Sequence, residues 1–319
     1  MGSIEEEIDL DLVVSARRQP AAGVVELELR DPRGGRLPAW APGAHVDVIL
    51  PNGSARQYSL CGDPGDRSTW RLGVLLEREG RGGSRHIHEQ LHEGAAVATR
   101  GPRNNFELLP AARYVFIAGG IGVTPIVPMA AAAAAAGADW TLLYGGRSLG
   151  TMAFREELAA HGERVAIRPE DEHGLLDLAG ALGEPRDDTL IYCCGPAPLL
   201  EAVERAAAHW PAGALHLERF AAKEMGAPEN EDSFEVELLA SGMTITVPPD
   251  KSILECVDEA GIYTVSSCQE GTCGSCETVV LEGTPEHRDS LMTPAEQQAS
   301  ETMMICVSRS RCPRLVLDL

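Results

Sequence analysis

The pattern of apolar and polar positions changes twice along the chain. From residue 10 to about residue 109, short runs alternate apolar with polar residues and are interrupted by Gly and Pro, as in VVELELR at 24–30 and WRLGVLLER at 70–78. Alternation with a period of two is typical of antiparallel strands, and many short strands favour a small barrel. We therefore predict an antiparallel β-barrel domain over residues 1–110.

After residue 113 the apolar runs become continuous, as in YVFIAGG at 114–120, and helical stretches such as LLEAVERAAAHW at 199–210 separate them. Strands that are apolar on both faces and alternate with helices are typical of a parallel sheet covered by helices. This pattern predicts an α/β domain with a parallel sheet over residues 111–222.

A polar and charged stretch, AAKEMGAPENEDS, ends that pattern and predicts a linker at residues 223–233. Beyond it, FEVELLASGMTITVPP at 234–249 predicts a hairpin, and SILECVDEAG at 252–261 predicts an amphipathic helix. The remaining residues, 234–319, are predicted to form a third domain that mixes strands and helix.

Net charge and cysteine content narrow the possible functions. The 319 residues carry a formal net charge of -21, which argues against nucleic acid or an anionic membrane as a partner and favours a basic protein. No apolar window approaches the roughly 18 residues of a membrane span, and the N-terminal residues lack a secretory signal pattern, so we expect a cytoplasmic protein. Nine cysteines, an odd number, argue against a disulfide scaffold and for thiols that bind metal or are buried.

Four of the cysteines have the spacing of a metal centre. The pattern C-x4-C-x2-C-x29-C matches the plant-type arrangement in which four thiolates hold a two-iron two-sulfur cluster. A structural zinc site is the alternative, but such sites usually offer two close pairs of ligands and only one close pair is present. Gly271 and Gly274 favour the cluster, because a loop around it needs unusual backbone angles, although both are also ordinary turn formers. The predicted cluster ligands are Cys268, Cys273, Cys276 and Cys306.

Further motifs occur in order along the chain. They are RQYSL at 56–60, GRGGS at 80–84, PRNNF at 102–106, AGGIGVTP at 118–125, YCCGP at 192–196 and EHRD at 286–289. Together with the cysteine loop they resemble the phthalate dioxygenase reductase family, a flavin- and cluster-containing branch of the ferredoxin-NADP reductase-like enzymes, over nearly the whole chain. The resemblance implies a flavin-binding barrel, an NAD(P)-binding α/β domain and a ferredoxin domain of the α+β, β-grasp type.

The first of these motifs offers groups for a flavin. Arg56 can place a permanent charge on a phosphate, and Tyr58 has an aromatic body for the flavin ring and a hydroxyl for the ribityl chain. Ser59 is similar to the family serine that faces the reactive nitrogen of the ring. A surface arginine, a core tyrosine and an ordinary strand serine are the alternative interpretations. The residues assigned to the flavin are Arg56, Gln57, Tyr58, Ser59, Gly82, Gly83 and Ser84.

The GRGGS motif at 80–84 can turn its N–H groups inward around an anion; a flexible hairpin tip is the alternative interpretation. In the family this segment closes on a terminal phosphate, which implies FMN rather than the longer FAD.

AGGIGVTP predicts a strand end, a glycine turn and a helix start, which present N–H groups and a helix dipole to a pyrophosphate. It is not the usual dinucleotide fingerprint, since Pro125 occupies the place of the third glycine and no acidic residue ends the next strand. Arg147 follows that strand and could accept a 2'-phosphate, yet the resemblance favours NADH. The residues assigned to the nucleotide are Gly119, Gly120, Gly122, Thr124, Arg147, Cys194, Gly195 and Pro196.

Three residues are assigned to the hydride path: Ser59, Cys194 and Phe220. Cys194 resembles the family cysteine beside the nicotinamide, where it would help to position the reacting carbon, and a buried packing cysteine is the alternative. Phe220 resembles the family aromatic residue that covers the flavin until the nicotinamide displaces it, and ordinary packing at the domain boundary is the alternative.

These expectations combine into one function. NADH gives up two electrons at once and the cluster takes one, so a flavin that handles both must stand between them. We expect a monomeric reductase that passes electrons from NADH through FMN and a 2Fe-2S cluster to the terminal component of a Rieske-type oxygenase or demethylase. An equivalent reductase of a P450 or another monooxygenase is the alternative. A cluster-based redox sensor and a non-redox protein with a zinc site are more remote.

Overall fold

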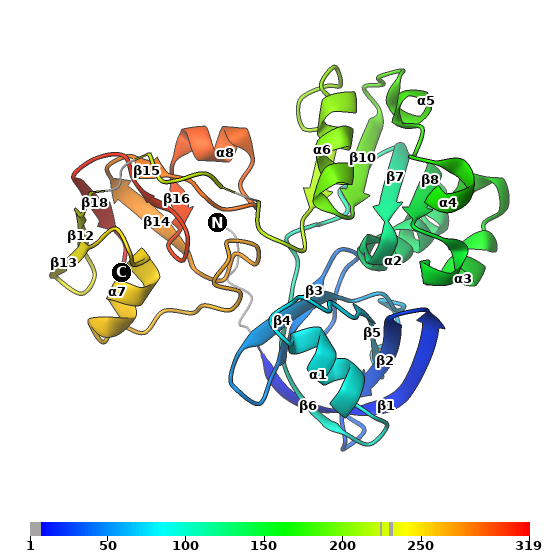
Figure 1. Ribbon diagram of the computed structural model, residues 1–319, viewed down its shortest axis with the longest axis horizontal. Helices are drawn as coiled ribbons and strands as arrows, with labels where there is room; N and C mark the ends of the chain where they lie inside the picture. The colour runs from blue at the N-terminus through cyan, green and yellow to red at the C-terminus, as the bar shows by residue number, and fades with distance from the viewer. Residues whose placement is uncertain (1–7, 224, 230–231) are drawn as a thin grey trace. The chain divides into compact units, whose positions relative to one another are not determined.

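The computed structural model describes residues 8–223, 225–229 and 232–319. It separates into two units, one that ends at Phe220 and one that begins at Ala221 (Figure 1). Part of the predicted linker, namely residues 224, 230 and 231, lies outside the described residues. None of the described helices combines the length and apolar character that crossing a membrane requires.

The N-terminal part of the first unit is a six-stranded antiparallel sheet, as predicted, with the order β4-β3-β6-β1-β2-β5. A bridge between Leu60, just after β4, and Leu72 of β5 links the two edges and closes the sheet toward a barrel. The elements are β1 Asp9–Ala21, β2 Val24–Arg30, β3 His45–Ile49, β4 Ala55–Ser59, β5 Trp70–Leu75, α1 Gly83–Gln90 and β6 Ala96–Arg103.

The period of two in the sequence sets the two faces of β5. Trp70, Leu72 and Val74 are buried in the barrel core. Arg71 and Gly73 alternate with them and therefore face the other side of the strand. This second face of β5 meets the α/β part of the same unit, where Gly73 lies next to Thr124 and Phe154.

The α/β part holds a five-stranded parallel sheet with the order β11-β10-β7-β8-β9, which confirms the second prediction. Phe116 packs in the core on one face of the sheet and Ile117 in the core on the other, which explains the continuous apolar runs. The strands are β7 Arg113–Gly119, β8 Asp139–Gly146, β9 Val165–Pro169, β10 Thr189–Cys194 and β11 Leu215–Glu218. The helices are α2 Val123–Ala135, α3 Arg155–Ala159, α4 Glu170–His173, α5 Leu178–Leu182 and α6 Ala197–Ala206, with 3-10 turns η1 Gly120–Gly122, η2 Leu149–Thr151 and η3 Gly162–Arg164.

The barrel and the α/β part share a hydrophobic core. Ala21, Val24 and Cys61 from the barrel pack in the same buried cluster as Phe154 and Met152. The backbone N–H of Ala22 also donates a hydrogen bond to the carbonyl of Gly150 at 2.8 Å. The barrel and the α/β part therefore form one compact unit that ends at Phe220. The predicted domain division at residues 110 and 111 lies inside this unit and stays a prediction.

The second unit contains a mixed sheet with the order β13-β12-β18-β14-β16, and helix α7 packs against it in the β-grasp manner. The predicted hairpin is formed by β12 and β13, with Phe234 opposite Val247. The predicted helix begins after Ser252, whose hydroxyl accepts the N–H of Glu255 while the Glu255 carboxylate accepts the N–H of Ser252. The elements are β12 Phe234–Leu238, β13 Met243–Val247, α7 Ile253–Glu259, β14 Glu277–Glu282, β15 Pro285–Glu286, α8 Pro294–Ala299, β16 Thr302–Met304, β17 Arg309–Ser310 and β18 Arg314–Leu317.

Candidate functional site

The two motifs assigned to the flavin meet in space. Gly82 has a left-handed backbone (φ 86°) and caps α1, which begins at Gly83, so this segment is a helix start rather than a hairpin tip. A Cβ placed on Gly83 would lie 2.7 Å from Cγ and 2.8 Å from Nε of Arg56. Only glycine allows the Arg56 side chain to lie across the first turn of the helix. A guanidinium next to free helical N–H groups is a site for a phosphate.

Ser84 and Gln57 already have partners within the protein. The Ser84 hydroxyl accepts the backbone N–H of Glu77 at 2.9 Å and keeps its own proton for a further acceptor. The amide of Gln57 donates to Oδ1 of Asp47 at 2.7 Å, and Arg103 donates to the same oxygen at 2.6 Å. Asp47 is buried, so this network fixes the strand that carries the flavin residues.

Ser59 carries the clearest sign of a missing partner. It is 4% exposed, and among the described residues its Oγ has no hydrogen-bond partner. A buried hydroxyl without a partner costs about 1–3 kcal/mol, so such a group is expected to bond to a ligand. Burial raises the pKa of the neighbouring Tyr58 to about 12, which keeps its phenol protonated as a donor. Both side chains fit a flavin.

The glycines of AGGIGVTP and YCCGP allow two loops to touch at the carboxyl edge of the parallel sheet. A Cβ on Gly122 would lie 2.4 Å from the carbonyl oxygen of Cys194, and one on Gly195 would lie 3.0 Å from Cα of Gly119. Helix α2 starts directly after Gly122. The first turns of α2 and of α6, which follows Pro196, thus lie at the edge where α/β proteins bind nucleotides.

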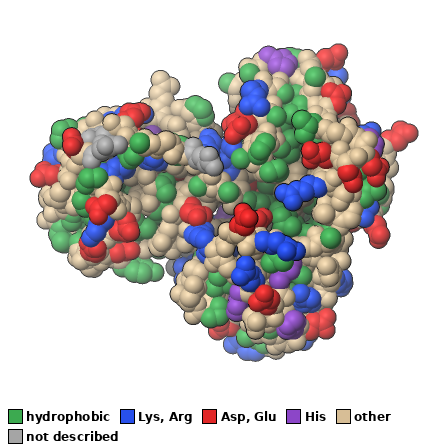
Figure 2. Space-filling model, viewed as in Figure 1, with side chains coloured by type: hydrophobic (Ala, Val, Ile, Leu, Met, Phe, Trp, Pro, Cys, Tyr) green, Lys and Arg blue, Asp and Glu red, His purple; other side chains and the backbone are tan. Residues whose placement is uncertain are grey.

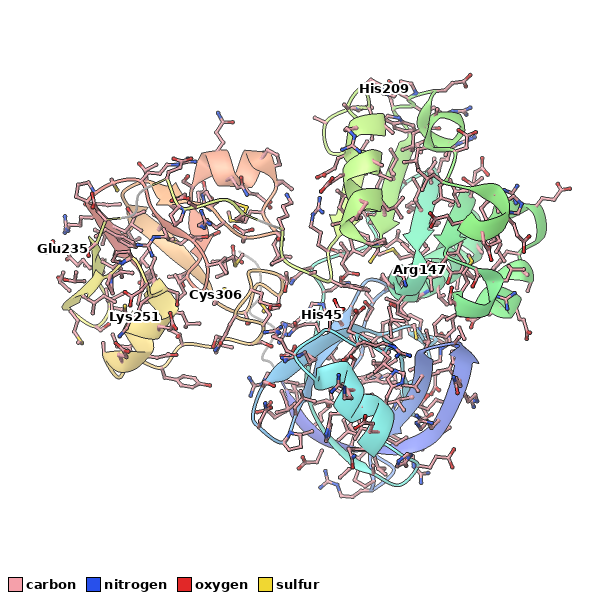
Figure 3. All side chains as sticks on the ribbon, in the orientation of Figure 1. His45, Arg147, His209, Glu235, Lys251 and Cys306 are labelled. Carbon is pink, nitrogen blue, oxygen red and sulfur yellow. The ribbon has the colours of Figure 1, made fainter. Side chains whose placement is uncertain are left out.

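The structure shows the surroundings of Thr124 and Arg147, two residues assigned to the nucleotide. The Thr124 hydroxyl donates to the carbonyl of Ile121 at 2.9 Å, and the residue is buried, so its side chain closes the turn. Arg147 is exposed just beyond β8, at the edge where the strands end (Figure 3). The ligand roles of both residues stay predictions.

Cys194 is fully buried at the end of β10, and its thiol lies 3.6 Å from Oε2 of Glu218 on β11. Burial raises the pKa of the Cys194 thiol well above its usual range and raises the pKa of Glu218 to about 8. Both groups therefore hold protons at neutral pH. The sequence pattern did not single out Glu218, although an acidic residue at a strand end in LHLERF was a signal that could have found it.

Phe220 follows Glu218 by two positions, and 48% of its surface is exposed. An exposed aromatic ring is not ordinary core packing, which was the alternative interpretation. Its proposed role over the flavin stays a prediction.

In the second unit the four predicted ligands are all buried. The N–H groups of Glu270 and Thr272 point at Sγ of Cys268, at 3.3 and 3.4 Å. Hydrogen bonds from the thiols of Cys273 and Cys306, from the Thr272 side chain and from the N–H of Glu270 lower the pKa of Cys268. Gly271 has φ 67°, and a Cβ there would lie 2.6 Å from Val307, so the loop requires this glycine. This donor set fits a thiolate-bound cluster.

The spacing of the four cysteines bears on the zinc alternative. A structural zinc site usually offers two close pairs of ligands, whereas Cys273 and Cys276 are the one close pair in this set of four. Each iron of a 2Fe-2S cluster needs two cysteines, so a set of four fits the cluster.

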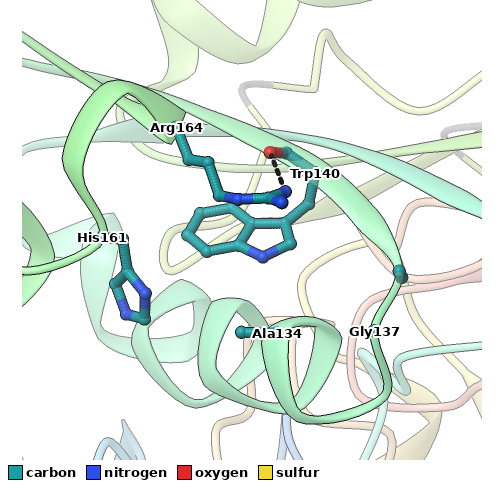
Figure 4. Close-up of a pocket in the computed structure, with 6 residues that line it drawn as sticks. Ala134, Gly137, Trp140, His161 and Arg164 are labelled. Carbon is teal, nitrogen blue, oxygen red and sulfur yellow. Dashed lines mark hydrogen bonds between the residues drawn. The ribbon is translucent and has the colours of Figure 1, made fainter.

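A separate cavity of about 220 Å³ lies at the opposite edge of the parallel sheet, near the start of β8 (Figure 4). The Arg164 guanidinium lies 5.7 Å from the ring centre of Trp140 and donates to its carbonyl at 3.4 Å. His161 meets the same indole edge-on at 5.0 Å. This cavity is distinct from the nucleotide edge, where β8 ends.

Comparison with known proteins identifies the domains and the family of the chain. Residues 236–311 match the 2Fe-2S iron-sulfur cluster binding domain family, and residues 116–205 match the oxidoreductase NAD-binding domain family. The chain is 43% identical to phenoxybenzoate dioxygenase subunit beta of Ectopseudomonas oleovorans, over 97% of both chains.

Two solved structures are similar to nearly the whole chain. The structure of phthalate dioxygenase reductase has a TM-score of 0.72 at 36% identity and covers 98% of both chains. A type IV self-sufficient cytochrome P450 monooxygenase has a TM-score of 0.91 at 45% identity, covering 98% of this chain but 41% of that one. With its NAD-binding and 2Fe-2S domains, the chain is an NADH-dependent oxidoreductase that belongs to the phthalate dioxygenase reductase family.

Proposed function

We propose that this chain takes electrons in pairs from NADH and delivers them singly, through FMN and a 2Fe-2S cluster, to the terminal component of an oxygenase system. The observation that carries the proposal is the buried group of four cysteines in a chain whose other unit has a nucleotide edge. When bound, FMN supplies the conversion between two-electron and one-electron chemistry that such a pairing requires.

The residues have distinct tasks in this proposal. Arg56 and the first turn of α1 hold the terminal phosphate, which favours FMN over FAD. Ser59 and Tyr58 donate to the flavin, and the protonated pair Cys194 and Glu218 lines the place of the nicotinamide. The backbone N–H groups around Cys268 stabilise the negative charge on sulfur.

The proposed partner is the oxygenase component of a Rieske-type system. Relatives that match over almost their full length include a vanillate O-demethylase oxidoreductase of Pseudomonas putida and a phthalate dioxygenase reductase of Burkholderia cepacia. A monooxygenase of the P450 class is the second candidate, because a chain segment 45% identical to this protein is part of a self-sufficient P450. In that case the acceptor would be a haem domain.

We also propose that the protein works as a monomer in the cytoplasm and prefers NADH to NADPH. Light scattering after size exclusion tests the first point. Steady-state assays with both nucleotides test the preference, and higher catalytic efficiency with NADPH would overturn it.

The partner is tested by reconstitution. The purified reductase is mixed with a Rieske-type oxygenase and, separately, with a P450, each supplied with NADH and its substrate. Product formation with the first and not with the second supports the proposed partner class. Product with the P450 alone would move the proposal to the second candidate, and loss of NADH oxidation in every assay would reject the function itself.

A further inference from the structure

The outer face of β5 forms a tight contact between the barrel and the α/β part of the first unit. Gly73 lies on this face, and a Cβ added to it would lie 2.8 Å from Cγ2 of Thr124 and 3.1 Å from two ring carbons of Phe154. Its backbone does not need a positive φ, so the reason for glycine here is space rather than conformation. A glycine inside a strand often marks such a close approach of another segment.

Several interactions fix Phe154, which lies on the α/β side of this contact. Phe154 is a buried, non-glycine residue in the left-handed region (φ 58°), which persists only when the surrounding structure fixes it. The Arg71 guanidinium lies 5.2 Å from the centre of its ring. Arg71 also donates to the carbonyl of Cys61 from Nε at 3.0 Å and to the Glu157 carboxylate from Nη2 at 3.0 Å.

The same contact is connected to the nucleotide edge. Thr124 is the second residue of α2 and lies two positions after Gly122, where an added Cβ would lie 2.4 Å from the carbonyl oxygen of Cys194. The buried Tyr144 hydroxyl is within hydrogen-bond distance of the carbonyls of Gly120 (3.2 Å) and of Ala153, next to Phe154 (3.1 Å). One side chain therefore links the glycine turn to the Phe154 segment. Figure 1 shows α2 at the end of the parallel sheet that lies next to the barrel.

We propose that Gly73 is a positioning residue for hydride transfer: its missing side chain lets Thr124 and Phe154 rest on β5 and so sets the distance between the nicotinamide and flavin sites. Arg71 and Glu157 hold the contact closed. The inference rests on the proposed function, in which the C4–H bond of reduced nicotinamide breaks and its hydride, with both electrons, passes to the flavin, leaving oxidised nicotinamide.

The test is Gly73→Ala in the full holoprotein. The added methyl must push Thr124 and Phe154 away by several tenths of an ångström, and misplacement by 1 Å can cost a hydride donor and acceptor about a hundredfold in rate. We expect flavin reduction at saturating NADH to slow by about tenfold, measured anaerobically by stopped flow per bound FMN. The isotope effect with NADH deuterated at the transferred position should rise, while FMN and iron contents stay as in the native chain.

Gly150→Ala is the matched control. Gly150 belongs to the same junction, since its carbonyl accepts the N–H of Ala22, but a Cβ there meets nothing within 4 Å. This control should reduce its flavin at the native rate. Adding Thr124→Ser to Gly73→Ala removes the clashing methyl and should restore much of the rate, judged against Thr124→Ser alone.

A crystal structure gives a readout independent of activity: in Gly73→Ala, Thr124 and Phe154 should be displaced from β5. An unmoved contact, or an unchanged rate and isotope effect, would overturn the inference. The proposed function would still stand in that case if NADH reduces the flavin of the native chain. If Gly73→Ala does not accumulate as holoprotein, Glu157→Gln is the variant to measure. Its flavin should be reduced about threefold more slowly, and an unchanged rate would overturn the proposal. A native chain whose flavin NADH cannot reduce would reject the proposed function, and this inference with it.

Discussion

The thiol of Cys194 donates a hydrogen bond to the carboxyl of Glu218, with 3.6 Å between Sγ and Oε2, across the neighbouring strands β10 and β11. Burial raises the pKa of Glu218 to about 8, above the ordinary value of 4.5. The pair thus places two protonated groups at the proposed nicotinamide site. With its pKa raised to about 8, the carboxyl of Glu218 loses its proton in a pH range that assays can reach.

Stability and rate should both depend on Glu218. The folded state binds a proton that the unfolded state loses above pH 4.5, so this group's stabilising contribution decreases as pH rises from about 4.5 and is gone above about 8. Flavin reduction should slow as pH rises through about 8. Glu218→Gln should remove both dependences, as measured by thermal unfolding and stopped flow from pH 6 to about 9.5. Identical pH profiles in the native chain and the variant would refute this role.

Cys306→Ser should remove the cluster and leave FMN bound, because the cysteine belongs to the second unit and the flavin residues to the first. Iron, sulfide and FMN analysis of the purified variant measures this directly. Cys312→Ser is the control, since that thiol lies in the same unit but outside the predicted ligand set. Full iron content in Cys306→Ser would show that the ligand assignment is wrong.

Arg56→Ala should weaken FMN binding. A hydrogen bond to a charged group contributes about 1.5–3 kcal/mol, so the dissociation constant should rise by roughly ten- to a hundredfold. Fluorescence titration of the flavin-free protein gives the constant. Arg33→Ala, at an exposed position outside the site, is the control and should bind FMN as the native chain does. Equal affinity in Arg56→Ala would place the phosphate elsewhere.

The acidic second unit should steer the encounter with the electron acceptor. Residues 234–319 contain fourteen acidic and five basic side chains, a formal net charge of -9, and Figure 2 shows Asp and Glu gathered where α7 lies. Such charge speeds association with a basic patch and is screened over about 8 Å at physiological ionic strength. Added salt should therefore slow coupled turnover by about tenfold and change ferricyanide reduction much less. Equal salt sensitivity in both assays would leave the acidic face as a solvated surface only.

Local patterns in the sequence predicted much of the fold and of the candidate site. The period of two in β5 and the continuous apolar runs of the parallel sheet depend on residues close together in the chain, and so do three of the four cluster cysteines, Cys268, Cys273 and Cys276. Residues 82–84 are predicted from the sequence as an anion-binding segment or a hairpin tip, and they form the start of α1. This helix was not foreseen because it is short and begins with a glycine cap, Gly82, followed by Gly83. Glu218 and Gly73 needed the structure, since their roles arise from residues distant in sequence, namely Cys194 and the pair Thr124 and Phe154.

The central claim is that one chain converts paired electrons from NADH into single electrons at the cluster. Anaerobic addition of NADH to the purified protein, followed by absorbance and by electron paramagnetic resonance at low temperature, tests it most directly. The claim predicts that the flavin absorbance bleaches first and that the signal of a reduced 2Fe-2S cluster then appears, with Cys306→Ser bleaching its flavin but giving no cluster signal. Flavin bleaching without any cluster signal in the native chain would contradict it.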